Sequence, residues 1–334
     1  MSTRFQILSL DGGGLKGLFT ASFLAELEKN TGSRVVDHFD LIAGTSTGGI
    51  IALALGLGFS AEQVLEFYLE EGERIFPPSM LRKLKKLAVT AYSDEGLNDA
   101  LDRYFEDRKL GESTARLVIP AYSAEAGEIY LFKTAHHPRL RNDFRERAVD
   151  VARATAAAPT YLAPAVRESG LRLIDGGIWA NNPVMVAIAE ALGYLAQPVD
   201  AIAALRVGTT QEVVSASDFP HDSGDVLSAS PVIDFMIRAQ AQSARSMAYH
   251  ILRPGRFVEV NPTVTPNEYA LDKVSKELVK LGDFHYRQAS AELGDRGFLD
   301  HKAEPFVPVY TLSASPTGEA GDNYTGSSTK GGAT

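Results

Sequence analysis

The chain has 334 residues, of which 45% are hydrophobic and 22% are charged, and it carries a formal net charge of −9. This composition is ordinary for a globular protein, and the acidic balance argues against a general binder of nucleic acid polymers. The chain has no cysteine, which excludes disulfides, thiol catalysis and cysteine-ligated zinc. No apolar run reaches the roughly 18 residues of a membrane-spanning helix, so we expect any membrane contact to be peripheral. With no signal peptide in the sequence, we expect a cytoplasmic protein.

The chain opens with a predicted buried strand at residues 5–10, and the run Asp-Gly-Gly-Gly-Leu-Lys-Gly follows it at 11–17. Apolar residues then recur every four positions, which predicts a helix. Three successive glycines leave backbone N–H groups free to face a ligand without interference from side chains. We therefore predict that Gly12, Gly13 and Gly14 supply the donors of an oxyanion hole, which stabilises negative charge during acyl transfer.

The second predicted strand leads into a turn with the pattern G-x-S-x-G at residues 44–48, and an apolar, helix-like run follows the turn. Residues two places either side of the serine crowd each other in such a turn. Gly44 and Gly48 relieve this crowding because glycine has no Cβ. The turn lifts the Ser46 hydroxyl above the end of the sheet and aims the first N–H groups of the next helix toward the position of an oxyanion. Ser46 is thus the candidate nucleophile, although the motif alone also fits an ordinary turn between buried elements.

A capping box at residues 60–63 predicts the start of a third helix, and two prolines at 77–78 interrupt the pattern after it. The next run, residues 81–87, places four cations between leucines spaced by three: Arg82, Lys83, Lys85 and Lys86. If helical, this run has a leucine edge and a basic face. Two interpretations stay open: a solvated helix with its leucines in the core, or a membrane-surface helix attracted to anionic lipid.

The rest of the chain continues to alternate between strands and helices. Strands are predicted at residues 117–121, 129–132, 171–174, 201–207 and 256–260. Helices are predicted at about 97–105, 148–158, 231–252 and 271–293, with a break in the last one near Gly282. The alternation indicates a three-layer α/β/α fold with a mainly parallel central sheet. We expect one domain over residues 1–312, a mobile polar loop at 211–230 and a disordered polar tail at 313–334.

Asp175 follows the predicted strand at 171–174 and precedes two glycines, Gly176 and Gly177, which let the backbone pass close to another loop. Its carboxylate could accept the Ser46 proton directly. A carboxylate with an ordinary pKa of about 4 is a poor base for a hydroxyl. The role therefore requires partial desolvation, or a geometry in which proton transfer accompanies the attack. Taken alone, the segment also fits a simple hairpin turn.

Two other arrangements stay open at this point. The first is a Ser–acid–His triad, whose base would be one of three histidines late in the chain: His250, His285 and His301. The second is a dinucleotide-binding loop, because residues 12–17 also match G-x-G-x-x-G between a strand and a helix. That fingerprint places an acidic residue at the end of the second strand, whereas Asp40 precedes this strand. His136 and His137 lack the spacing of metal ligands, so we expect neither a metal nor a cofactor.

Taken together, these stretches resemble the patatin-like phospholipases. The run at 11–17 is similar to the family's glycine-rich oxyanion motif, and the turn at 44–48 is similar to its nucleophile elbow. Residues 175–177 resemble its D-G-[GA] motif, which carries the second member of a Ser–Asp dyad. Residues 156–161 resemble a further family segment, A-[AS]-x-A-P-x-[YF]. The order and spacing of these motifs fit the family from residue 5 to about residue 210.

The resemblance implies a patatin-like fold and a metal-free serine lipid acyl hydrolase of the phospholipase A type. Such an enzyme would cleave membrane phospholipid esters, here at the inner face of the membrane. The resemblance also implies that Asp175, and no histidine, is the base for Ser46. The run at 11–19 is similar to that of bacterial members, some of which are effectors of cyclic-oligonucleotide antiphage (CBASS) systems. This similarity implies a cyclic dinucleotide activator.

A function from a different class remains as the alternative: a non-catalytic nucleotide-binding or scaffold protein that uses the glycine loop. Ser46 and Asp175 distinguish the two functions, because a binding protein needs neither a nucleophile nor a base. Either function is compatible with a homo-oligomer.

Overall fold

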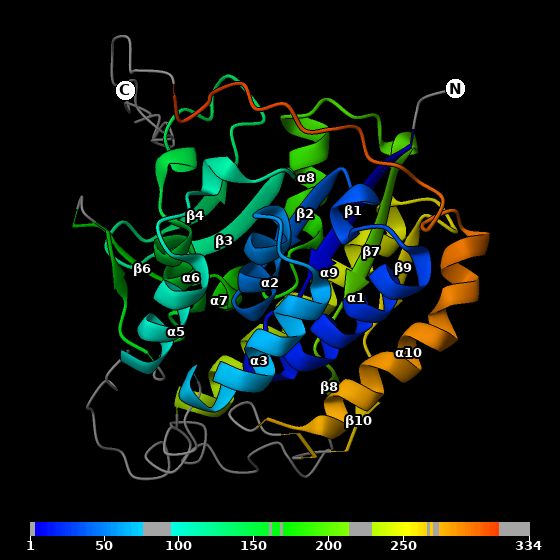
Figure 1. The fold of residues 1–334 in the computed structure, drawn as a ribbon, viewed down its shortest axis with the longest axis horizontal. Helices are drawn as coiled ribbons and strands as arrows, with labels where there is room; N and C mark the ends of the chain where they lie inside the picture. Colours follow the sequence, from blue (N-terminus) through cyan, green and yellow to red (C-terminus); the bar gives the residue numbers. More distant parts are fainter. Residues whose placement is uncertain are drawn as a thin grey trace, which may run out of the picture.

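The computed structural model describes residues 4–75, 95–159, 162–167, 170–213, 229–265, 268–269 and 274–313. Three features predicted from the sequence lie outside these ranges: the basic run at 81–87, most of the polar loop at 211–230, and nearly all of the polar tail at 313–334. A central sheet runs through the described part of the chain, with helices on both of its faces (Figure 1).

The sheet is built from eight strands that follow the apolar runs of the sequence. They are β1 (Phe5–Leu10), β2 (Leu41–Gly44), β3 (Leu117–Ser123), β4 (Glu128–Lys133), β5 (Ala165–Val166), β6 (Arg172–Asp175), β7 (Ile202–Val207) and β9 (Phe257–Val260). Their order is β5-β6-β3-β2-β1-β7-β9, and β4 also pairs with β3. The pairs along β3-β2-β1-β7-β9 are parallel, whereas β4, β5 and β6 pair antiparallel. A separate two-stranded sheet consists of β8 (Gln211–Glu212) and β10 (Thr263–Val264).

Two layers of helices cover the faces of the sheet. One layer contains α1 (Gly17–Thr31), α2 (Thr47–Gly56), α3 (Ala61–Ile75), α5 (Glu95–Phe105), α6 (Ala148–Ala156) and α10 (Lys276–Asp295). The other contains α8 (Val184–Gly193) and α9 (Ala229–Ile251), with the short α7 (Gly177–Ala180) in contact with α9. The predicted three-layer fold with a mainly parallel sheet is confirmed. Within the described ranges, no helix combines the length and the apolar character that crossing a membrane requires.

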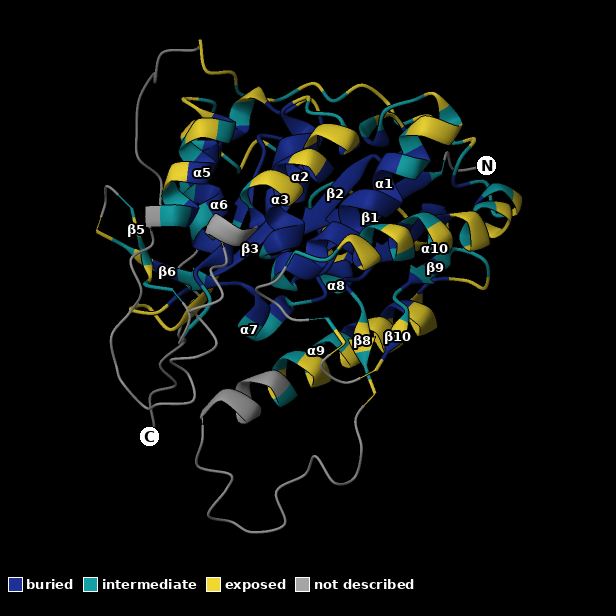
Figure 2. Cartoon of the chain, turned by 60° about the horizontal axis from the view of Figure 1, so that its bottom comes forward, coloured by how far each residue is buried: buried dark blue, intermediate teal, exposed yellow. Residues whose placement is uncertain are grey.

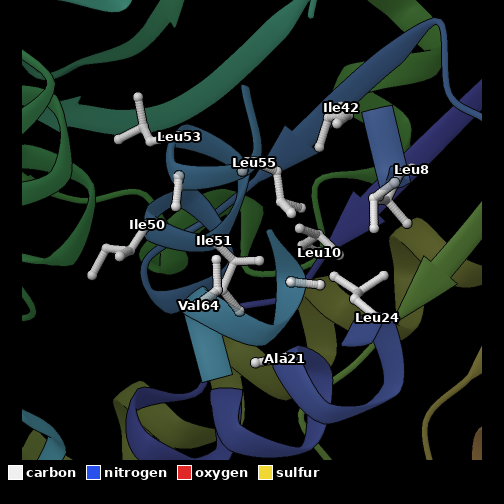
Figure 3. Packing of buried hydrophobic residues seen from close by; sticks show 14 of the residues in the cluster. Leu8, Leu10, Ala21, Leu24, Ile42, Ile50, Ile51, Leu53, Leu55 and Val64 are labelled. Atoms are coloured by element: carbon white, nitrogen blue, oxygen red, sulfur yellow. The ribbon is translucent and has the colours of Figure 1, made fainter. Parts of the chain in front are cut away.

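Alternate residues of the central strands face opposite helical layers, as the geometry of a strand dictates. Figure 3 shows Leu8, Leu10 and Ile42 within the larger apolar cluster, together with side chains from α1 and α2. Ile7 and Leu41 belong instead to the second cluster, with α8 and α9. Figure 2 shows the sheet buried throughout its centre, while the outer faces of α9 and α10 are exposed. Burial on both faces explains why the parallel strands are nearly continuous apolar runs in the sequence.

Local signals in the sequence explain one helix start but mislead about another helix. The capping box at α3 is present, because the Ser60 N–H donates to Gln63 Oε1 at 2.8 Å and the Gln63 N–H donates to Ser60 Oγ at 3.0 Å. The predicted break near Gly282 is wrong, since α10 continues through this residue. A Cβ added to Gly282 would lie 2.7 Å from the carbonyl oxygen of Phe19. This glycine therefore lets α10 approach α1 closely.

Candidate active site

The carboxyl ends of three parallel strands meet at one edge of the sheet and carry most of the site. Leu10 of β1 is the register partner of both Gly44 of β2 and Val207 of β7. The glycine loop, residues 11–17, leaves β1 at this point, and the turn with Ser46 leaves β2. Parallel pairing thus brings the two predicted segments together. Crevices at this edge are where open α/β sheets generally bind their ligands.

Ser46 immediately precedes α2 and has backbone angles of φ 54° and ψ −122°, a conformation that non-glycine residues rarely adopt. Tight contacts enforce the turn around it. A Cβ added to Gly44 would lie 2.1 Å from the carbonyl oxygen of Gly48, and one added to Gly48 would lie 2.3 Å from the carbonyl oxygen of Leu10. Only glycine fits at these two positions. Strain of this kind persists only where the surrounding structure enforces it, and it is typical of functional sites.

Asp175 ends β6 and is buried, with 6% of its surface exposed. Its Oδ1 accepts the Gly177 N–H at 2.6 Å, in a segment that leads from β6 into α7 and not into a hairpin. Burial raises the pKa of Asp175 to about 6. Hydrogen bonds from the Gly177 N–H and, with a smaller effect, from the Ser46 side chain oppose this rise. Since a higher pKa makes the carboxylate a stronger base, the structure supplies the desolvation that proton abstraction from Ser46 requires.

The glycine loop lies directly beside Ser46, because a Cβ added to Gly12 would lie 3.2 Å from the Ser46 Cβ. The Gly12 N–H donates to the carbonyl oxygen of Asn181 at 3.0 Å, so this group is already engaged. The N–H groups of Gly13 and Gly14 have no acceptor among the residues that the structure describes. The candidate oxyanion donors are therefore those of Gly13 and Gly14, whereas Gly12 lets the loop approach the serine.

Side chains that the sequence did not single out hold the glycine loop in place. The carbonyl oxygen of Gly12 accepts hydrogen bonds from Thr209 Oγ1 at 3.0 Å and from Asn181 Nδ2 at 3.4 Å. Asp11, at the start of the loop, forms a buried ion pair with Arg206 of β7. Thr209 lies two residues after the end of β7, and its place at the carboxyl end of a parallel strand could have identified it as a candidate site residue. No local pattern marks Asn181 or Arg206.

His301 lies at the opposite edge of the sheet from Ser46. Its Nε2 is 2.7 Å from Asp40 Oδ2, so the chain does contain an Asp–His pair. Asp40 precedes β2, however, whereas Ser46 follows that strand. The length of β2 separates this pair from the serine, and the pair fixes the segment around His301 against the sheet.

The other two candidate histidines lie on helices away from the site. His250 belongs to α9, and His285 belongs to α10, where its ring contacts the Phe19 ring edge to face. None of the hydrogen bonds among the described residues joins a histidine to Ser46 or Asp175. The same part of the chain contains no group of three or more histidine, aspartate or glutamate residues that could hold a metal ion.

Comparisons with known proteins identify the fold and the family of the chain. Among solved structures, the fold is similar to that of VipD from Legionella pneumophila, with a TM-score of 0.50 and 12% sequence identity over 89% of this chain and 67% of that chain. The sequence profile described as "Patatin-like phospholipase" matches residues 8–188. The chain therefore shares its α/β fold with VipD, and it belongs to the patatin-like phospholipase family.

Three curated relatives share the name "cGAMP-activated phospholipase". The protein from Pseudomonas aeruginosa (strain BWHPSA011 / Pa011) is 35% identical over 318 residues, which cover 92% of this chain and 94% of the relative. The protein from Vibrio cholerae serotype O1 is 34% identical over 239 residues, which cover 65% of this chain and 67% of the relative. The similarity to the Pseudomonas protein thus extends well beyond the residues that the family profile matches.

Proposed function

We propose that the chain is a serine lipid acyl hydrolase of the phospholipase A type, with Ser46 and Asp175 as its catalytic dyad. One observation carries this proposal: the Ser46 hydroxyl, a buried carboxyl group with a raised pKa and two N–H groups that have no acceptor among the described residues converge at one edge of the sheet. Acyl transfer needs these three components, a nucleophile, a base and oxyanion donors. Membership of the patatin-like phospholipase family supports a lipid ester as the substrate.

The proposed reaction begins when Ser46 Oγ attacks the carbonyl carbon of the ester and Asp175 takes the hydroxyl proton. The carbonyl oxygen becomes negative and is stabilised by the N–H groups of Gly13 and Gly14. As this intermediate collapses, the bond to the alcohol breaks and Asp175 returns the proton to the departing oxygen. A water molecule then attacks the acyl carbon on Ser46 while Asp175 removes one of its protons. The bond between the acyl carbon and Ser46 Oγ breaks, Asp175 returns the proton to Ser46 Oγ, and the fatty acid leaves.

Labelling with a fluorophosphonate, which reacts with activated serines, tests the assignment of the nucleophile. We expect wild-type protein to be labelled at Ser46 and Ser46→Ala to remain unlabelled while it stays folded. The non-catalytic alternative predicts no labelling of either protein. Labelling of another serine in the wild type would contradict the proposed site.

We further propose that a cyclic dinucleotide activates the enzyme. The names of the relatives support this proposal, and so does the need to restrain a phospholipase that acts at the inner face of its own cell's membrane. Activation is a population shift: an activator that binds the competent state about 10⁴-fold more tightly converts a 1:99 mixture into 99:1. Phospholipid hydrolysis should rise when one member of a panel of cyclic di- and trinucleotides is added. Full activity that no member changes would contradict this proposal.

The basic run at 81–87 is proposed to bring the enzyme to anionic membranes. This proposal rests on the sequence, since the run lies outside the described residues. Each of its cations, Arg82, Lys83, Lys85 and Lys86, contributes roughly 1 kcal/mol near an anionic surface. The double variant Lys83→Glu/Lys86→Glu should lose hydrolysis of anionic vesicles far more than hydrolysis of a soluble ester.

The matched control for this charge reversal is Lys276→Glu/Lys280→Glu, because both lysines are exposed on α10. It changes the net charge by the same amount at another surface. We expect the control to leave vesicle hydrolysis close to that of the wild type. Equal loss in both double variants would show that net charge, and not the run at 81–87, governs membrane contact.

A further inference from the structure

The side chain of Thr155 forms a hydrogen bond with the strained backbone of Ser46. The Ser46 N–H donates to Thr155 Oγ1 at 3.0 Å. Thr155 lies in the last turn of α6 and has no exposed surface. No backbone carbonyl among the described residues accepts this N–H. Without Thr155 Oγ1, the partly buried donor would lose its acceptor, and its desolvation would go uncompensated.

The same hydroxyl reaches the strand that supports Asp175. Thr155 Oγ1 donates to the carbonyl oxygen of Pro120 in β3 at 2.6 Å. A Cβ added to Gly176 would lie 2.4 Å from this carbonyl oxygen, so Gly176 packs directly against it. One hydroxyl thus connects the turn of the nucleophile to the backbone next to the carboxylate.

A second bond from the end of α6 acts on Asp175 itself. The Asp175 N–H donates to the carbonyl oxygen of Ala157 at 2.9 Å. Thr155 and Ala157 are two residues apart at the end of one helix, so this helix end forms hydrogen bonds with the backbone of both Ser46 and Asp175. Thr155 directly precedes the alanine-rich segment at 156–161, and Ala157 belongs to it. The proposed reaction gives this segment no chemical role.

We propose that the end of α6 is the positioning element that sets Ser46 against Asp175, with Thr155 as its decisive residue. The inference rests on the proposed function of this dyad. The hydrogen bonds of Thr155 Oγ1 go to backbone groups of Ser46 and Pro120, so we assign it as a positioning residue and not a catalytic one. Its hydroxyl must accept one hydrogen bond and donate another, which threonine and serine can do and valine and alanine cannot.

The first test compares Thr155→Val with Thr155→Ser in hydrolysis of a soluble ester. Valine keeps the γ-methyl group and replaces the hydroxyl with a second methyl group, whereas serine keeps the hydroxyl and loses the γ-methyl group. We expect Thr155→Val to lower kcat about 10- to 100-fold, with KM nearly unchanged, because a small misplacement of reacting groups costs rates of this order. Thr155→Ser should keep kcat within a few-fold of the wild type. A folded Thr155→Val with the kcat of the wild type would overturn the proposal.

The second test keeps the proposal falsifiable if valine prevents folding. Thr155→Ala and Thr155→Ser both lack the γ-methyl group and differ from each other only in the hydroxyl. We expect the rate of fluorophosphonate labelling at Ser46 to fall in Thr155→Ala and to be restored in Thr155→Ser. Equal rates in these two variants would assign Thr155 a packing role and overturn the inference.

Thr134→Val is the control for the loss of a buried hydroxyl. Thr134 is buried, and its Oγ1 accepts the Leu117 N–H at 3.0 Å, a bond of the same kind at the amino end of β3. We expect this variant to lose stability as Thr155→Val does and to keep its kcat. A parallel loss of kcat in both would show that the effect follows stability, which would contradict the inference. Wild-type protein that hydrolyses no ester with any nucleotide of the panel would refute the proposed function instead.

Discussion

Arg206 and Asp11 form a buried ion pair behind the glycine loop, with Arg206 Nε at 3.2 Å and 3.1 Å from the two carboxylate oxygens of Asp11. Arg206 Nη1 also lies 2.9 Å from Glu259 of β9, and Glu259 lies 2.7 Å from Nε of Arg245 in α9. Asp11 and Glu259 raise the pKa of Arg206 above its ordinary value, which keeps the guanidinium charged despite its burial. The first residue of the loop is therefore fixed through a chain of ion pairs that ends on α9.

The other end of the loop is connected to the same helix. Lys16 Nζ lies 2.9 Å from Glu212 Oε1, and Glu212 Oε2 lies 3.4 Å from Arg238. Arg238 and Arg245 are seven residues apart in α9, and this spacing places them on one face of the helix. Both ends of the glycine loop thus depend on the position of α9.

Replacing Arg206 by methionine should destabilise the protein strongly. The variant leaves the Asp11 carboxylate buried without its partner, which typically costs about 3–5 kcal/mol in the free energy of unfolding. Denaturant unfolding measures this change. Arg253→Met is the control, because Arg253 pairs with Asp200 at 2.7 Å on the surface, where a pair contributes about 0–1 kcal/mol. Similar losses in the two variants would contradict the role assigned to the buried pair.

Ser46→Ala and Ser46→Gly should both abolish ester hydrolysis, and the glycine variant should be more stable than the alanine variant. Alanine usually stabilises a protein relative to glycine. At a φ of 54° and ψ of −122°, however, a Cβ is strained, and glycine should be more stable than alanine by about 1 kcal/mol or more. Thermal unfolding of the two variants measures the difference. A more stable alanine variant would show that the turn stores no strain at Ser46.

Activity should follow the ionisation of Asp175. The carboxylate can accept the Ser46 proton only when it is ionised, and its pKa is raised to about 6. We therefore expect kcat/KM for a soluble ester to rise with pH, reach half of its maximum near pH 6 and level off above that value. Asp175→Asn should be nearly inactive throughout. A profile with its midpoint near pH 4 would contradict a desolvated base.

The same raised pKa predicts an opposite effect of pH on stability. The folded protein holds the Asp175 proton more tightly than the unfolded chain, whose carboxyl has an ordinary pKa near 4. The stabilisation by this proton is complete at low pH and is lost as the pH rises from about 4 to about 6. Asp175→Asn should therefore stabilise the protein at pH 8 by about 1–3 kcal/mol and have little effect at pH 4. Denaturant unfolding of the wild type and Asp175→Asn at the two pH values measures whether the variant is more stable at pH 8 and nearly equal at pH 4.

Replacing His250, His285 or His301 by glutamine should leave kcat/KM within about threefold of the wild type. His301→Gln should also lower stability, because it removes the partner of Asp40. Kinetics of each folded variant on a soluble ester provide the measurement. If one substitution silenced a folded enzyme, a Ser–acid–His triad would replace the dyad.

The sequence predicted the segments of the site whose geometry is local. The strand–turn–helix around Ser46 depends on Gly44 and Gly48, which lie within two residues of it, and the parallel sheet follows from the alternation of elements. The spacing of the glycine loop likewise predicted donors beside the serine, although it could not show that the Gly12 N–H is already bonded to Asn181.

The supporting residues could not be predicted, because their partners are distant in the chain. Thr155 is 109 residues from Ser46, and Arg206 is 195 residues from Asp11. Gly282 illustrates the same limit, because the need for glycine at this position comes from the close approach of α1 and not from its own helix. Such contacts exist only after the sheet has placed the elements side by side.

Release of fatty acid from phospholipid vesicles by the purified protein tests the central claim most directly. Wild type, Ser46→Ala and Asp175→Asn would be compared, each alone and with the panel of cyclic di- and trinucleotides. We predict that the wild type releases fatty acid, that a cyclic dinucleotide increases the release, and that both variants stay silent while folded. Equal release by Ser46→Ala and the wild type would contradict the dyad. A folded wild type that binds a nucleotide and releases no fatty acid would establish the non-catalytic alternative.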